Sequence, residues 1–519
     1  MRQPVAPQLR PDIAVATLAF GLAVAVAAYV VRPFQAGTLG FDAAASVLYF
    51  DRILAGRHLE TFLGATPKPL LTVLYGAVHA VVPDWRAISV LAIVAYASAI
   101  AAATTLAFRL AGIAAAAFVA IGLVGSAKLL QDVDAAYAVS WALLCWSAAG
   151  LLVSADRPRY GLAGLALALG GLARFETLIV TGAAALLLAG AAGAALARRS
   201  GWGPVRARLP LLLGALTLPV QALHDWLLTG NPAYSQTVPV LGSVGLPLSG
   251  VDGVIAAIRA HYAPEPGLVL LALLGVPLLV RRDRHVAAGS LALALGVLLF
   301  LVSLGQAGIF VSDRYFAPVD LALIFVAGIG LGSLRVSSLT ARLAALRRPA
   351  RRATLPVLAT VAGGLAALAL VRPFGPLDRA TRRDANFNGV LHADVERLTP
   401  TIQAALAAAG ARPPALDDGD GTGPTGSQAV VLVPVLTVPQ LAVDLDLPLS
   451  AIGGTDGARV AVDGTYPKAG QLVLHYAGRD DPPSAFEVFE VDRPTQEGAI
   501  EIDPVRVDPA GRFWLVRIR

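Results

Sequence analysis

The sequence has little cysteine and little charge. Among its 519 residues there is a single cysteine, Cys145, so the chain can form no disulfide within itself. Charged residues make up only 15%, whereas hydrophobic residues make up 56% and the mean hydropathy is +0.67. This balance excludes an ordinary soluble globular protein and indicates a polytopic membrane protein. The chain also lacks an internal repeat of roughly 20–50 residues, which weighs against transporters built from duplicated halves.

Apolar runs long enough to cross a membrane recur along the chain. A spanning helix needs about 20 apolar residues, and about eleven segments approach or reach this length. They are 13–31, 87–108, 111–127, 135–153, 160–174, 177–197, 209–228, 267–280, 286–304, 315–334 and 354–371. The first is not followed by a small-residue cleavage site and a soluble chain, so we interpret it as a retained span rather than a signal peptide.

One further apolar segment, Leu70–Pro83, decides the sidedness of everything after it. It has only about 14 residues and is bracketed by prolines, so we predict an interfacial or re-entrant helix rather than a span. The arginines between spans then gather on one side, which the positive-inside rule makes cytoplasmic together with the N-terminus. The same bias accounts for the net charge of +6 without a nucleic-acid partner. The weight of Ala, Val, Leu and Arg is typical of high-GC bacterial genes, so we expect a bacterial plasma-membrane protein.

Residues 373–519 differ in composition from residues 1–372. Proline, glycine and aspartate become more frequent, and the apolar runs shorten to strand length. The pattern predicts a helix over 394–409 and strands near 429–433, 458–462, 471–476, 486–491 and 513–517. We therefore predict a transmembrane domain over 1–372 and a small α+β extracytoplasmic domain over 373–519.

The stretch after the first span carries an acid in a helix-forming context. A helix from about residue 42 to residue 55 places Asp42, Ser46 and Tyr49 on one face, at the spacing i, i+4, i+7. Aspartate is also a preferred N-cap residue, so Asp42 could serve only to cap this helix.

Other polar clusters fall at the outer ends of the predicted spans. They are Asp132 and Asp134 between spans three and four, Arg174 and Glu176 between spans five and six, His224 and Asp225 at the end of span seven, and Arg314 and Tyr315 at the start of span ten. Ionisable groups near hydrocarbon are costly and tend to mark substrate or ion paths, so we predict one outward-facing cavity.

Each cluster also has a plainer interpretation. The two aspartates could be a helix-terminal acid pair or a solvated loop, because a lone D-x-D is common, and a metal is the alternative. Arg174 and Glu176 could form a structural ion pair. The histidine could be an interfacial residue beside Trp226, and Asp320, inside span ten, could pair with a basic neighbour.

The order of these features resembles the GT-C class of integral-membrane glycosyltransferases, which use lipid-phosphate-linked sugars. The resemblance covers residues 1–372. It rests on Asp42 after the first span, on Thr66-Pro67-Lys68-Pro69-Leu70, on Asp132 or Asp134, on Arg174-Phe175-Glu176 as an Arg-Pro-Glu-like motif, on Gly230-Asn231-Pro232 and on Arg314-Tyr315. Phe41 stands where the bacterial arabinosyl- and mannosyltransferase type often carries a second acid, and Phe175 replaces the usual proline.

The resemblance implies a one-step inverting transfer of a sugar from a polyprenyl-phosphate donor to an extracytoplasmic glycan, lipid or protein. Such a transfer needs cations for the phosphate and a carboxylate base, which would be Asp42. The expected substrate-binding residues are Lys68, Asp132, Asp134, Arg174, Glu176, His224, Arg314 and Tyr315, with Asp132 and Asp134 as candidates for a divalent cation. Two other classes stay open: a transporter or lipid flippase whose translocation path the same charges line, and a non-catalytic assembly protein whose outer domain is the active surface.

Overall fold

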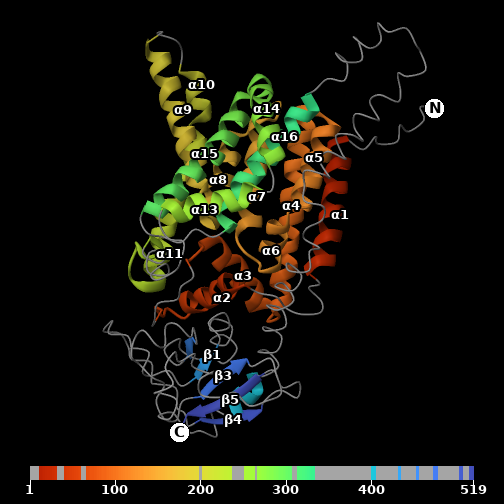
Figure 1. Ribbon diagram of the computed structural model, residues 1–519. Coiled ribbons are helices and arrows are strands. Elements are labelled where there is room, and N and C mark those ends of the chain that lie inside the picture. Colours follow the sequence, from red (N-terminus) through yellow and green to blue (C-terminus); the bar gives the residue numbers. More distant parts are fainter. Residues whose placement is uncertain are drawn as a thin grey trace, which may run out of the picture.

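The computed structural model describes most of the helical part of the chain and a small sheet near its C-terminus (Figure 1). The described residues are 11–31, 40–59, 66–197, 202–236, 251–263, 266–306, 313–333, 399–404, 431–433, 452–454, 472–476, 502–506 and 513–518. The helices, in chain order, are α1 (Pro11–Val31), α2 (Phe41–Leu54), α3 (Pro69–Val81), α4 (Trp85–Ala111), α5 (Ile113–Val124), α6 (Ala127–Asp134), α7 (Val139–Val153), α8 (Tyr160–Ala173), α9 (Thr177–Ala197), α10 (Gly203–Arg208), η1 (Leu209–Leu216), α11 (Thr217–Thr229), α13 (Val251–Tyr262), α14 (Pro266–Arg282), α15 (Arg284–Gln306), η2 (Asp313–Phe316) and α16 (Ala317–Ser333), where η marks a 3-10 helix.

The helices form a bundle with an apolar outer surface. On α1, alanines at intervals of four, Ala19, Ala23 and Ala27, are buried, and the helix packs closely against α4. Its outer face carries Leu18 and Leu22, which are 74% and 45% exposed. Within the described residues, five stretches are long and apolar enough to cross a membrane, namely 11–29, 85–111, 177–197, 203–229 and 284–306. The protein is therefore membrane-embedded.

The predicted spans coincide with described helices in most places, with three differences. Helices α5, α7, α8 and α16 are apolar but shorter than the five long stretches, so these helices do not establish the predicted number of about eleven spans. The span predicted over 209–228 is not one regular helix, because 3-10 geometry over Leu209–Leu216 interrupts it. The segment 354–371 lies outside the described residues.

Helices α2 and α3 lie across one end of the bundle (Figure 1). At about 1.5 Å per residue, the 13 residues of α3 extend only about 20 Å, which is short of a bilayer core of about 30 Å. Its Tyr75 hydroxyl donates to the carbonyl of Ala136 at 3.0 Å, which ties the helix to the start of α7. The helix predicted over Leu70–Pro83 is present, and its interfacial or re-entrant position stays a prediction.

The five strands are β1 (Val431–Val433), β2 (Ile452–Gly454), β3 (Leu472–Tyr476), β4 (Ile502–Arg506) and β5 (Phe513–Ile518). They form one sheet in the order β2-β1-β3-β5-β4, parallel from β2 to β3 and antiparallel between β3, β5 and β4. Pro504, which has no backbone N–H to donate, lies on the edge strand β4. Three strands coincide with predicted ones, whereas 458–462 and 486–491 lie outside the described residues. The separate α+β domain stays a prediction.

Candidate functional site

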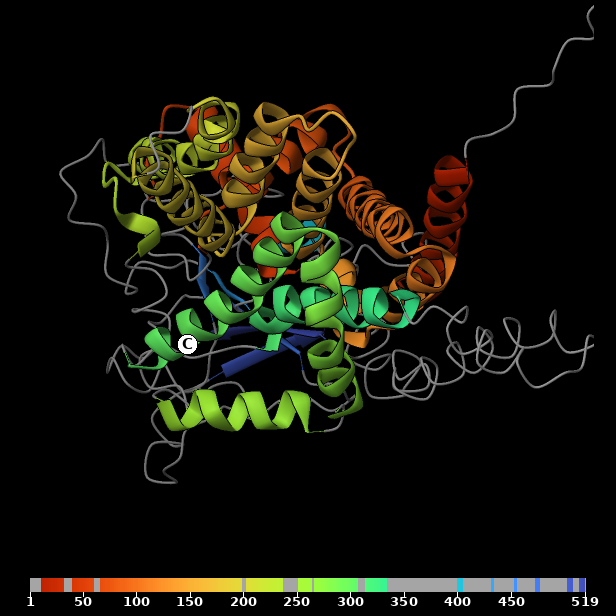
Figure 2. The ribbon, with the colours of Figure 1, turned by 90° about the horizontal axis from the view of Figure 1, so that it is seen from above.

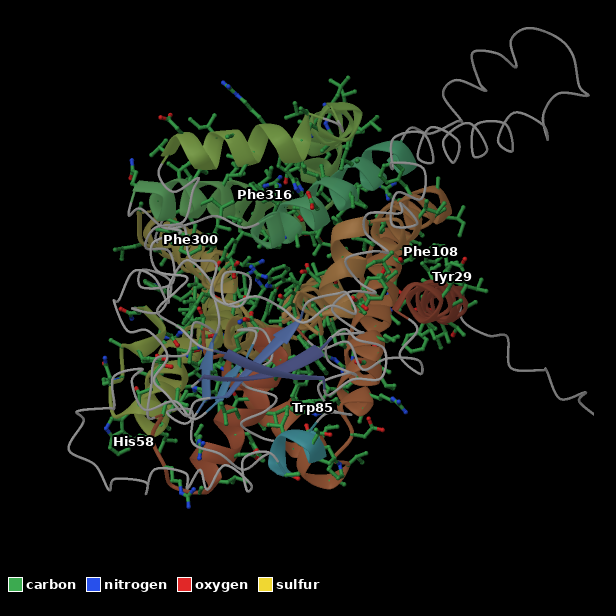
Figure 3. All side chains as sticks on the ribbon, turned by 60° about the horizontal axis from the view of Figure 1, so that its bottom comes forward. Tyr29, His58, Trp85, Phe108, Phe300 and Phe316 are labelled. Carbon is green, nitrogen blue, oxygen red and sulfur yellow. The ribbon has the colours of Figure 1, made fainter. Side chains whose placement is uncertain are left out.

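A cavity of about 110 Å³ lies where α2, the α8–α9 connection, α11 and α15 meet. Its lining residues are Asp42, Thr66, Pro67, Lys68, Tyr137, Ala138, Gly171, Leu172, Ala173, Arg174, Phe175, Glu176, Gln221, Ser235, Phe300, Leu304 and Tyr315. One wall is apolar and includes Phe300 of α15, which Figure 3 labels. The lining also includes ionisable side chains, so the cavity can hold a molecule with both an apolar and a charged part.

Asp42 belongs to the first turn of α2 and points to a cation. The N-cap position is Gly40, so the interpretation of Asp42 as a cap is wrong. The Gly40 amide instead donates to the carbonyl of Ala135 at 2.9 Å, which fixes the start of α2 against the end of α6. The Asp42 carboxylate accepts a hydrogen bond of 2.8 Å from Lys68 Nζ, and the carboxylate lies near the positive end of the helix dipole.

The face of α2 predicted to carry Asp42, Ser46 and Tyr49 is buried in the protein. Burial, with the charges of Asp42 and Asp225 nearby, raises the pKa of Tyr49 well above its ordinary value. Helix α2 contacts α3 and α11, and its exposed residues, Asp51 and Leu54, lie near its C-terminal end.

Arg174 and Glu176 form a buried ion pair on the rim of the cavity. Arg174 is the C-cap residue of α8, with an extended backbone that turns its side chain toward Glu176. Its Nε lies 3.1 and 3.2 Å from the two carboxylate oxygens, and Nη2 also donates to Oε1. The guanidinium carbon lies 5.4 Å from the centre of the Tyr315 ring.

Arg174 and Glu176 both remain charged although they are buried. Burial disfavours both charged forms, but the ion pair outweighs it, so the pKa of Glu176 is lowered and the pKa of Arg174 is raised. The charge of Asp132 adds to the shift of Arg174. The structural ion pair considered for these residues exists, and both partners also line the cavity.

A second buried network holds the wall formed by α11. The Asp225 carboxylate accepts hydrogen bonds from the side-chain amide of Gln221 at 2.9 Å, from the backbone N–H of Ser235 at 2.8 Å and from the hydroxyl of Ser235 at 2.7 Å. Gln221 Nε2 also lies 3.3 Å from the carbonyl oxygen of Pro67, the residue before Lys68. Gln221 and Asp225 together thus link α11 to Pro67 and to Ser235 at the cavity, although the side chain of Asp225 does not line it.

Two comparisons with solved structures bear on this arrangement. ArnT from Cupriavidus metallidurans in the apo state is 14% identical, with a TM-score of 0.54 over 97% of this chain and 96% of that one. The archaeal oligosaccharyltransferase AglB from Archaeoglobus fulgidus, in complex with an inhibitory peptide and a dolichol-phosphate, is 12% identical, with a TM-score of 0.53 over 97% of this chain and 74% of that one. The chain has the GT-C fold. ArnT bound to undecaprenyl phosphate also matches, with a TM-score of 0.51. No protein-family model and no curated protein matches the sequence.

Within this GT-C fold, Asp132 and Asp134 lie in the last turn of α6 rather than in a loop. Both are only 4% exposed, so the solvated-loop interpretation is wrong and the helix-terminal acid pair is correct. Neither aspartate lines the cavity, but Tyr137 and Ala138, a few residues further along the chain, do. Among the residues that the structure describes, no group of three or more His, Cys, Asp or Glu side chains could hold a metal.

The remaining predicted site residues of the GT-C fold fall into two sets. Tyr315 and Lys68 line the cavity, whereas the side chain of Arg314 lies outside what the structure describes. His224 is buried in α11 with its Nδ1 3.7 Å from Asp225, and it does not line the cavity.

Sequence reasoning missed Gln221 and Ser235. Gln221 lies one helical turn before Asp225, and this spacing could have indicated a buried polar network. Ser235 and the apolar wall of α15 gave no such signal. Asp320 does pair with a basic neighbour, but this is His261 of α13, whose Nε2 lies 3.0 Å away and whose ring stacks on Phe316, labelled in Figure 3.

Proposed function

We propose that this protein is a glycosyltransferase that moves a sugar from a polyprenyl-phosphate donor to an acceptor hydroxyl outside the cytoplasm, in one inverting step. The observation that carries the proposal is the cavity that brings the carboxylate of Asp42 together with the cations of Lys68 and Arg174. The solved GT-C structures support a lipid-phosphate donor, because ArnT is described as bound to undecaprenyl phosphate and AglB as complexed with a dolichol-phosphate.

The chemistry follows from the charges at the cavity. The acceptor oxygen attacks the anomeric carbon of the sugar, and the bond from that carbon to the phosphate oxygen breaks. The electron pair leaves with the polyprenyl phosphate, whose oxygens Lys68 and Arg174 bind. The acceptor proton passes to the Asp42 carboxylate as general base. A single carboxylate is enough, because phosphate is already a good leaving group.

Lys68 has a double role in this proposal. Without substrate it donates to Asp42 at 2.8 Å, which holds the carboxylate in the cavity and neutralises it. A donor phosphate competes for the same ammonium group, so donor binding loosens the ion pair and leaves the carboxylate available to the acceptor. Glu176 keeps the Arg174 guanidinium in place, and the negative charge of Asp132 also favours the charged guanidinium. No step is assigned to a metal.

The membrane orientation is part of the proposal. Arginines at 109, 157, 159, 206, 208, 281, 282 and 284 follow or precede the helix ends opposite α2 and α3, which the positive-inside rule assigns to the cytoplasm. The N-terminus is then cytoplasmic, and the cavity and residues 373–519 are extracytoplasmic, in a bacterial plasma membrane.

The test is transferase activity of Asp42→Asn with a polyprenyl-phosphate sugar as donor. Loss of a positioned general base typically lowers the rate about 10²- to 10⁴-fold. The matched control is Asp51→Asn, which makes the same change at an exposed position of the same helix. Unchanged turnover of folded Asp42→Asn protein refutes the base assignment.

A further inference from the structure

A second cavity opens at the end of the bundle opposite α2 and α3. Its volume is about 130 Å³, and helices α4, α7, α8, α9, α15 and α16 surround it. Figure 2, which looks onto this end, shows the green helices α14 to α16 beside the orange and yellow helices of the first half. The cavity extends from His285 and Val153 at the helix ends inward to Trp146 and Val180.

The lining of this cavity is almost entirely apolar. Apart from His285 at the mouth, its side chains with polar atoms are Ser147, Ser290 and Trp146, and the indole of Trp146 already donates to Thr177 Oγ1 at 2.8 Å. An apolar cavity of this size stays dry in other proteins and takes up hydrocarbon instead. The chemistry of the lining therefore selects an aliphatic chain.

The mouth is charged, and its charge is mostly positive. His285 is the second residue of α15 and follows Arg284. The carboxylate of Asp283 accepts from the amides of His285 and Val286 at 2.9 and 3.0 Å and so caps the helix. Arg282 closes α14 next to it. On the other side, the Arg159 amide donates to the carbonyl of Leu152 at 3.0 Å, beside the lining residue Val153. The arginine side chains are exposed.

We propose that this second cavity binds one acyl chain of an anionic phospholipid from the leaflet at this end, with the lipid headgroup held by the arginines at the mouth. The apolar interior accounts for the chain, and the positive rim accounts for the anionic headgroup. The site lies on the side of the bundle away from Asp42, so the proposal does not depend on the proposed transferase function.

Gly289 allows the cavity to be filled without disturbing the fold. It lines the cavity, and a Cβ added to it would meet no atom within 4 Å. Gly289→Leu therefore places a side chain in the space meant for the lipid. Gly193→Leu is the matched control, because Gly193 lies on the membrane helix α9, meets no atom within 4 Å and does not line the cavity.

The experiment uses the full chain in nanodiscs and phospholipids with brominated acyl chains, which quench nearby tryptophan fluorescence. Trp146 lines the cavity, so the signal of interest is the fluorescence component that is lost in Trp146→Phe. We expect brominated phosphatidylglycerol to quench this component more strongly than brominated phosphatidylcholine. We expect the difference to vanish in Gly289→Leu and in Arg282→Gln/Arg284→Gln, and to persist in Gly193→Leu.

Three results would overturn the proposal. Equal quenching of Trp146 in Gly289→Leu and in the unmodified protein places the lipid outside the cavity. Equal quenching by brominated phosphatidylglycerol and by brominated phosphatidylcholine shows that the arginines do not select an anionic headgroup. Relief of the quenching by an equimolar amount of unlabelled undecaprenyl phosphate assigns the cavity to the polyprenyl lipid instead.

Discussion

The buried pair of Arg174 and Glu176 allows a structural role and a binding role to be separated. The pair is 8% and 4% exposed, so removing either partner leaves a charge in a poorly solvated place. Breaking a buried ion pair in this way costs about 3–5 kcal/mol, whereas replacing both partners by apolar residues is often neutral or even stabilising by about 1–4 kcal/mol. We therefore expect Glu176→Leu and Arg174→Leu each to lose about 3–5 kcal/mol in free energy of unfolding, and the double variant to recover most of it.

Activity should follow a different pattern. If Arg174 binds the donor phosphate, the double variant is stable but inactive, because no guanidinium remains at the cavity. Unfolding in a detergent series can be followed by tryptophan fluorescence, since the indole of Trp146 donates to Thr177, the neighbour of Glu176. Transferase turnover is measured on the same preparations.

Two outcomes would refute this reasoning. A double variant that keeps full turnover makes the pair structural only. Single variants that lose less than about 1 kcal/mol would behave like exposed ion pairs, which contradicts the burial on which the argument rests.

Three further predictions address the surroundings of the cavity. Lys68→Met should lower kcat/KM for the donor about 10- to 100-fold, because a hydrogen bond to a charged group is worth about 1.5–3 kcal/mol. Lys68→Arg should keep most of the activity. Equal kcat/KM values for the two variants would contradict a contact between Lys68 and the phosphate. Gly76→Ala should destabilise the protein by about 1–3 kcal/mol, because the added Cβ would lie 2.1 Å from the ring of Phe50. Gly182→Ala is the control and should not destabilise it, because its Cβ would meet nothing within 4 Å. Thermal unfolding of the two variants tests this difference. Ionised Glu176 stabilises the fold above its unfolded pKa of about 4.3, and this contribution is lost as the pH falls through its lowered folded-state pKa. Below about pH 5, the slope of unfolding free energy against pH should therefore be shallower in the double variant Arg174→Leu/Glu176→Leu than in the unmodified protein.

Local patterns predicted the helices that begin the site. Hydrophobic periodicity gave α2 over nearly its observed length, and the short run between prolines gave α3 as a short helix. Asp42, Arg174, Glu176 and Tyr315 line one cavity, whereas Asp132, Asp134, His224 and Asp225, which the same prediction placed in it, do not.

What the sequence could not provide were contacts between distant segments and breaks in regular helices. The 3-10 geometry of η1 has no counterpart in the apolar pattern, which runs on through α11. The break between α5 and α6 coincides with Gly125, the C-cap of α5, and Ser126, whose hydroxyl accepts from the Leu129 amide at 3.4 Å. The bonds of Asp225 to Ser235 and of His261 to Asp320 join residues 10 and 59 positions apart. No periodicity reports such pairs.

The contact between Gln221 and Pro67 has a consequence for how the protein is made. The two residues are 154 positions apart, so at about 5–20 residues per second the ribosome needs about 8–30 s to reach Gln221 after Pro67 has been synthesised. During that interval Asp42 and Lys68 already exist, but the wall formed by α11, and later the one formed by α15, do not. The nascent chain therefore enters the membrane without a finished cavity, and the proposed catalytic centre can be completed only after Tyr315 has been synthesised.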